Sequence, residues 1–177
     1  DEIIDERILQ PLGMDNTYFN VPAEYNSLRV NIKDRDMSRF LDRPPTKYFS
    51  ASGGLTSSAE DYLRFEQMLL NGGELFGNRL LSPRSVRMMS SNQIGDLYKS
   101  FSRQQEGMGF GYTVAVTLDP ITSNARRSAG AFGWGGAFGT RSWTDPEEEL
   151  TAVIMLQQAY GPAQYDFENA VQQAIVE

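Results

Sequence analysis

The apolar residues before residue 107 recur at the three- and four-residue spacing of amphipathic helices. Residues 2–10 follow this spacing, with Ile4 and Ile8 on one face. No capping residue precedes them, so we expect an uncapped helix that the turn-rich segment Pro11–Thr17 stops. Residues 20–50 have no sustained period, and Pro44-Pro45 marks an irregular stretch. A loop of that length in a compact domain is typically functional or draped over the rest of the molecule.

The clearest helix begins after the candidate caps Ser57 and Ser58 and ends at Asn71-Gly72-Gly73. Its apolar stripe is formed by Tyr62, Phe65, Met68 and Leu69. A further helix is predicted from Ser82-Pro83, because proline suits the first helical position. The simplest interpretation of both stripes is that they face the core.

From residue 107 the pattern changes to the two-residue alternation of strands. Phe110, Tyr112, Val114 and Val116 predict one half-buried strand. Further strands are expected at 127–133, 136–144 and 150–158, the last of them buried on both faces. A final helix at 163–176 presents Phe167, Val171 and Ile175 on one side.

This order predicts an α+β fold: a helical segment, then an antiparallel sheet, then a C-terminal covering helix. We place the boundary between residues 1–106 and 107–177 and expect the two parts to form one incomplete domain.

A glycine-rich segment, residues 133–140, stands out among the predicted strands. Glycines weaken an ordinary strand because they have no side chain to pack. Their presence between aromatic residues indicates that something approaches the backbone closely. A bound substrate and a neighbouring chain segment remain alternatives.

Composition excludes several kinds of chemistry. The net charge is −7, which argues against nucleic acid as a partner. The chain has no Cys and no His, which excludes a thiol nucleophile, a complete Ser-His-Asp triad and the usual zinc ligands. We therefore expect no metal and no cofactor. No apolar run approaches the roughly 20 residues needed for a membrane span.

Four segments resemble class C-type serine β-lactamases and related esterases. Pro11-Leu12-Gly13-Met14-Asp15-Asn16-Thr17 is similar to their PLGM element, and Gly53-Gly54-Leu55 with Asp61-Tyr62-Leu63-Arg64-Phe65 to a loop and helix that follow it. Leu69 to Ser82 resembles the next hairpin and helix start. The last match is Gly133-Trp134-Gly135-Gly136, with Asp145-Pro146 beyond it. The matches occur in family order along nearly the whole chain.

The resemblance implies a partial β-lactamase/transpeptidase-like fold and three catalytic motifs. The family's nucleophile lies in Ser-x-x-Lys, but no serine here has a lysine three residues later. Tyr18-Phe19-Asn20 matches the letters of the second motif, Tyr-x-Asn, yet it follows the PLGM element instead of preceding it, so we interpret Tyr18 as a packed turn aromatic. Only the third motif is present, as Trp134-Gly135-Gly136. We therefore expect the C-terminal portion of such an enzyme, beginning after the second motif.

The resemblance assigns site residues around this third motif. Ala137 would supply a backbone N–H to the oxyanion hole, with Gly135 and Gly136 leaving room for an acyl group along the strand. The alternative is that the glycines admit the helix at 163–176. Trp134 stands where the family has lysine, which weakens carboxylate recognition and favours neutral esters or acyl substrates; the alternative is a core tryptophan. Ser52 and Gly53 would border the substrate.

Three further residues are placed by their position along the predicted strand. Trp143 lies an odd number of residues from Trp134, so we expect it in the core on the opposite face. Arg141 also differs in parity from Trp134 and is expected to pair with a carboxylate. Arg126-Arg127 would meet an anionic substrate or lie in a solvated turn, and we favour the turn.

Two functions follow from these observations. The first is a part of a serine hydrolase that forms an acyl-enzyme with esters, amides or β-lactams and is inactive alone. Its partners would be a small-molecule acyl substrate and the missing N-terminal portion or another chain. The second is a non-catalytic binding or oligomerisation module with the same fold. The resemblance favours a periplasmic or secreted location and leaves a cytoplasmic one open.

Overall fold

The computed structural model describes residues 1–30, 45–50, 52–100, 106–158 and 162–176. The chain opens with one helical run, formed by α1 (Glu2–Ile4), the π-helical η1 (Asp5–Leu9) and α2 (Gln10–Leu12). The Asp1 carboxylate accepts a hydrogen bond from the Glu2 N–H at 2.9 Å, so the prediction of an uncapped helix was wrong. The run continues past Pro11 and ends at Gly13, whose φ of 63° is left-handed.

The two predicted helices after residue 57 are confirmed. α4 (Ala59–Leu70) has Ser58 as its N-cap, and α5 (Pro83–Met89) has Ser82. Between them lies a small hairpin, β1 (Glu74–Leu75) and β2 (Asn78–Arg79). Two short 3₁₀ segments complete the first part, η2 (Ala23–Leu28) and η3 (Gly95–Ser100). The irregular stretch predicted at residues 20–50 contains η2, and its residues 31–44 lie outside the described residues.

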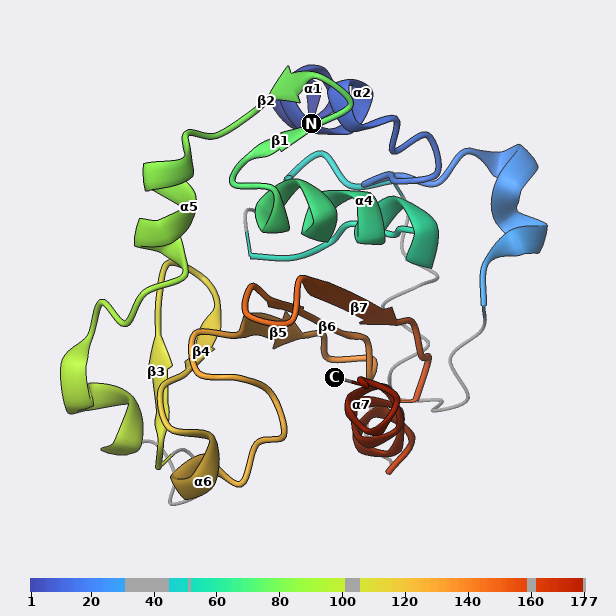
Figure 1. The fold of residues 1–177 in the computed structure, drawn as a ribbon. Coiled ribbons are helices and arrows are strands. Elements are labelled where there is room, and N and C mark those ends of the chain that lie inside the picture. The colour runs from blue at the N-terminus through green and yellow to red at the C-terminus, as the bar shows by residue number, and fades with distance from the viewer. Residues whose placement is uncertain (31–44, 51, 101–105, 159–161, 177) are drawn as a thin grey trace.

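A five-stranded antiparallel meander forms the second part, with the strands adjacent in chain order. Its strands are β3 (Met108–Phe110), β4 (Ala115–Thr117), β5 (Phe132–Gly135), β6 (Arg141–Asp145) and β7 (Leu150–Ile154). The short α6 (Pro120–Ser123) joins β4 to β5. Figure 1 shows α4 along one face of this sheet and the C-terminal helix α7 (Ala163–Gln173) along the other. The molecule therefore has the α+β architecture that the sequence predicts.

The predicted strand through Phe110 and Val116 is in fact a hairpin, β3–β4. The Gly111 N–H donates to the Val114 carbonyl at 2.9 Å, and Thr113 takes a left-handed φ of 70°. The sequence does not reveal this turn for two reasons. Apolar residues continue to alternate across it, and threonine rarely adopts the left-handed conformation.

The remaining strands are shorter or shifted from their predicted ranges. β5 starts later than the strand predicted at 127–133, β6 starts later than 136–144, and β7 ends earlier than 150–158. β7 is half-buried except at Ala152, so the prediction of burial on both faces was wrong.

An apolar core joins the helices to the sheet. Its buried members come from both parts of the chain: Leu9, Leu12, Met14, Met68, Leu69, Val86, Val116 and Phe132. The boundary after residue 106 stays a prediction. Within the described ranges, none of the helices is long and apolar enough to cross a membrane.

Candidate active site

The glycine-rich segment forms a hairpin instead of one continuous strand. β5 ends at Gly135, and the chain reverses through residues 136–140 before β6 begins at Arg141. The Gly136 N–H donates to the Thr140 carbonyl at 2.8 Å, which closes the turn. The segment is therefore the tip of two paired strands.

Some of its glycines are required by neighbouring backbone. A Cβ on Gly133 would lie 2.2 Å from the Ser142 carbonyl oxygen, and one on Gly139 would lie 2.2 Å from that of Gln158. A Cβ on Gly136 would meet the Thr140 hydroxyl oxygen at 2.2 Å. These nearest atoms lie on β6, in the turn and after β7, so the alternative that the glycines admit α7 is wrong. The neighbouring-segment interpretation holds at these positions.

Gly135 differs from the other glycines of the hairpin. It is exposed, and a Cβ there would meet only the Thr140 carbonyl oxygen, at 3.4 Å. β4 pairs with β5 at Phe132 and Gly133, whereas Trp134 and Gly135 pair only with β6. The last part of β5 thus has an open edge on the β4 side.

The Ala137 amide lies next to this open edge. Ala137 is exposed in the turn, and its N–H has no hydrogen-bond partner within the described part of the chain. The Gly136 N–H is already used by Thr140. Within the described part of the chain, Ala137 therefore offers a turn amide whose donor is not used by another residue.

The two tryptophans have opposite environments. Trp134 is 51% exposed and meets the Phe110 ring edge-on, with centroids 5.3 Å apart. Trp143 is fully buried and packs on Phe167 of α7. The alternative that Trp134 is a core residue is therefore wrong, and the core position of Trp143 is confirmed. Register explains the difference, because Trp134 pairs with Ser142 and so lies on the face opposite Trp143.

A buried charge cluster lies on the Trp143 face. Glu168 of α7 contacts Arg127 at 2.8 Å and Arg141 at 3.0 Å. The predicted carboxylate partner of Arg141 is thus confirmed. Arg127 is 8% exposed, so its predicted place in a solvated turn was wrong, although Arg126 is exposed. Burial lowers the pKa of the Arg127 guanidinium, and the Glu168 carboxylate opposes this effect.

The other predicted substrate neighbours, Ser52 and Gly53, lie on an exposed loop. The Ser52 hydroxyl contacts that of Ser50 at 2.9 Å, and a Cβ on Gly53 would meet nothing within 4 Å. No contact among the described residues brings this loop to the β5–β6 hairpin. Their role stays a prediction.

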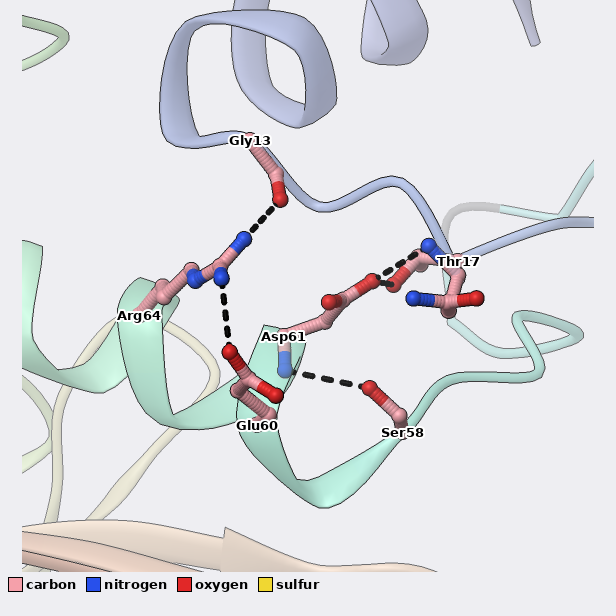
Figure 2. Close-up of polar contacts among 7 residues, drawn as sticks. Gly13, Thr17, Ser58, Glu60, Asp61 and Arg64 are labelled. Atoms are coloured by element: carbon pink, nitrogen blue, oxygen red, sulfur yellow. Dashed lines mark hydrogen bonds and ion pairs between the residues drawn. The ribbon is translucent and has the colours of Figure 1, made fainter.

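The first two family-like segments assemble into one structural unit around Asp61 (Figure 2). The buried Asp61 carboxylate accepts hydrogen bonds from the Asn16 N–H at 2.7 Å and the Thr17 hydroxyl at 2.9 Å. The Ser58 hydroxyl accepts from the Asp61 N–H at 3.2 Å, which caps α4. These residues fix the turn after α2 onto the start of α4.

Arg64 completes this unit one turn further along α4. Its guanidinium donates to the Gly13 carbonyl and pairs with Glu60 at 2.7 Å, as Figure 2 shows. The bond to Gly13 satisfies a carbonyl at the end of α2. All of these groups are used within the fold, so the unit holds structure and offers no free catalytic group. Tyr18 nearby stacks on Tyr25, with centroids 5.9 Å apart, as expected for a packed turn aromatic.

A buried carboxylate that the sequence did not flag lies between α4 and the sheet. Glu66 is 4% exposed and accepts a hydrogen bond from the Thr144 hydroxyl at 2.7 Å. Burial raises the pKa of the Glu66 carboxyl, while hydrogen bonds from Ser142 and Thr144 oppose the rise. Burial likewise raises the pKa of the Tyr62 hydroxyl one helical turn away. Glu66 lies four residues after Tyr62, and this spacing is the signal that could have placed it on the inner face of α4.

Glu66 predicts a pH-dependent stability. Folding raises the pKa of the Glu66 carboxyl. The contribution of Glu66 to the free energy of unfolding is therefore fully present below the pKa of the unfolded chain, near 4.3. This contribution is lost as the pH rises through the pKa of the folded chain. The variant Glu66→Gln keeps an acceptor for Thr144 and removes this loss. We expect this variant to unfold at a higher temperature than the wild type at pH 8, and the difference to shrink toward pH 4.5.

Thermal unfolding followed by circular dichroism across this range tests the expectation. Glu147→Gln, at an exposed position, is the matched control and should show no such trend; equal trends in both variants would contradict it.

Among the described residues, no group of three acidic side chains is placed to hold a metal ion.

The helix-covered antiparallel sheet is also the fold of a penicillin-binding protein homolog from Caulobacter crescentus, which superimposes with a TM-score of 0.63 at 16% identity and covers 89% of this chain and 46% of that one. The chain belongs to the Beta-lactamase family, whose profile matches residues 1–176. Protein Rv1367c of Mycobacterium tuberculosis (strain ATCC 25618 / H37Rv) is 37% identical over an alignment of 171 positions, which covers 88% of this chain and 43% of that protein. Esterase EstB of Burkholderia gladioli is 30% identical over 196 residues, covering 95% of this chain and 47% of the esterase.

Solved structures agree at the level of the fold. EstCE1, a hydrolase with promiscuous acyltransferase activity, superimposes with a TM-score of 0.77 at 20% identity, covering 97% of this chain and 50% of that one. At this identity the likeness shows the fold alone. The chain spans less than half the length of the curated relatives it matches.

Proposed function

We propose that this chain forms the substrate-facing wall of a serine hydrolase that acts on neutral esters through an acyl-enzyme, with the nucleophilic serine supplied by sequence that the chain does not contain. The observation that carries the proposal is the open end of β5, where Trp134 is exposed and the Ala137 N–H in the following turn has no hydrogen-bond partner among the described residues. Family membership and the similarity to Esterase EstB support it.

Each residue of the hairpin has a role in this proposal. The Ala137 N–H donates to the oxyanion of the tetrahedral intermediate, one of the two donors that such a site needs. Gly135 and Gly136 have no side chains, so the acyl group lies against the strand. Trp134 has no positive charge to attract a carboxylate, which favours an uncharged ester over a penicillin. Ser52 and Gly53 border the substrate from the loop before α4.

A chimera tests the proposal. In the chimera, this chain replaces the matched region of Protein Rv1367c, which is 43% of that protein. We expect the isolated chain to leave p-nitrophenyl acetate intact and the chimera to hydrolyse it, with inhibition by a fluorophosphonate. Hydrolysis by the isolated chain would overturn the proposed inactivity, and a folded chimera without activity would overturn the proposed function.

The oxyanion role of Ala137 has its own variant in the chimera. Ala137→Pro removes the N–H, and we expect kcat to fall about 100- to 1,000-fold. Ala137→Ser keeps the N–H and is the control, with little change expected. Circular dichroism confirms that both variants fold. Activity retained in a folded Ala137→Pro chimera would assign the oxyanion to another donor.

A non-catalytic binding or oligomerisation module is the second candidate. β7 pairs only with β6 among the described strands, and such an edge can take a strand from a partner. Light scattering on the isolated chain separates the two functions: a stable dimer that persists while the chimera stays inactive favours the module, and a monomer with an active chimera favours the hydrolase.

A further inference from the structure

Three aromatic rings from three different elements meet beside the open strand edge. Tyr98 of η3 lies 5.3 Å from Phe110 of β3 between ring centroids, with the planes tilted by 37°. Phe110 lies 5.3 Å from Trp134 of β5, and these planes are nearly perpendicular at 85°. We call these three residues the aromatic strip.

The middle of the strip is held firmly by its backbone. The Phe110 carbonyl accepts from the Gln93 N–H at 2.8 Å, and the Phe110 N–H donates to the Asn92 side chain at 3.3 Å. Gly109 lets Asn92 come close, since a Cβ there would lie 2.7 Å from its side-chain carbon. The Phe110 backbone is therefore fixed where the ring meets Tyr98 and Trp134, and such preorganisation lowers the entropy cost of binding.

The strip is exposed to solvent at the end that faces the candidate site. Trp134 is 51% exposed, while Phe110 and Tyr98 are half-buried. Trp134 is followed by the exposed Gly135 and Gly136 and by Ala137, whose N–H has no partner in the described part of the chain. An apolar wall next to a few convergent polar groups is the usual construction of a small-molecule site.

We propose that the aromatic strip binds an aromatic ring carried by the ester substrate. This inference rests on the proposed function, because the ester is placed by the backbone edge of β5. A perpendicular ring pair presents both a face and an edge to a third ring, and such contacts add about 0.5–1.5 kcal/mol beyond area burial. The substrate class is thus an uncharged aryl or arylalkyl ester.

Indole NMR on the isolated chain tests the strip without needing catalysis. The chain has only two tryptophans, so a ¹⁵N-labelled sample gives two indole signals, and the Trp134→Phe variant assigns them. We expect phenyl acetate to shift the Trp134 signal and not that of the buried Trp143, and hexyl acetate to shift it more weakly. Equal shifts of both signals, or none, would overturn the proposal.

A matched pair of variants locates the contact. Phe110→Leu removes the ring beside Trp134, and we expect affinity for phenyl acetate to fall about two- to tenfold. Tyr112→Leu is the control, because Tyr112 follows Phe110 by two residues, is 51% exposed and has no ring contact with Trp134 among the described residues. A dispersed Trp143 signal shows that each variant folds. Equal losses in both variants would contradict the proposal.

The outcomes for the strip and for the hydrolase are distinguishable. Binding that depends on Phe110 in a chain whose chimera is inactive would support the strip and overturn the hydrolysis. An active chimera whose preference for phenyl over hexyl acetate is unchanged by Phe110→Leu would overturn the strip and leave the hydrolysis standing.

Discussion

Replacing Glu168 by Gln is expected to lower the free energy of unfolding by about 3–5 kcal/mol, because it removes the counter-charge that the buried Arg127 shares with the half-buried Arg141. The side chains of Arg127 and Glu168 are 9% and 10% exposed in this contact. The variant keeps the size of the side chain, so the loss reports charge and not a cavity. Urea unfolding followed by circular dichroism measures it.

The matched control is Glu60→Gln. Glu60 also pairs with an arginine, at 2.7 Å, but its side chain is 77% exposed. Exposed pairs contribute at most about 1 kcal/mol. If both variants lose the same free energy, the contact between Glu168 and the arginines is as well solvated as the surface pair, and the burial described above is wrong.

This charge cluster also explains how α7 bears on the candidate site. Arg141 is the register partner of Gly135, so the α7 carboxylate holds β6 directly opposite the open end of β5. Arg127 ties the segment before β5 to the same carboxylate. The covering helix therefore fixes both strands of the hairpin from the face opposite Trp134.

The helices could be predicted from the sequence because their signals are local. Ser58 and Ser82 cap the helices that they precede, and the stripe of α4 faces the core as its spacing indicates. The hairpin between β3 and β4 could not be predicted from the sequence, because its left-handed residue is Thr113 and not a glycine. Alternation alone cannot tell a strand from two short strands with matching parity.

The candidate site was predictable only in part. Trp134 and Trp143 were placed on opposite faces by counting along one strand, and the conclusion holds although the two residues lie on different strands. The contact between Trp134 and Phe110 depends on the order of the strands and on the β3–β4 turn, which no local pattern carries. Glu66 looks polar in the sequence, yet tertiary packing places it inside.

The two tryptophans provide the second large effect. Trp143→Ala is expected to cost about 3–5 kcal/mol of unfolding free energy, since it removes a fully buried ring packed on Phe167 and leaves a cavity between the sheet and α7. Trp134→Ala removes a half-exposed ring whose described ring contact is Phe110, and should cost no more than about 1.5 kcal/mol. Urea unfolding of both variants followed by circular dichroism compares them. The pairing of Trp134 with Ser142 is what places Trp134 and Trp143 on opposite faces of the sheet. Comparable losses of unfolding free energy in the two variants would therefore mean that this register is wrong. A stable Trp134→Ala chain that no longer binds phenyl acetate would instead assign that exposed ring to the ligand.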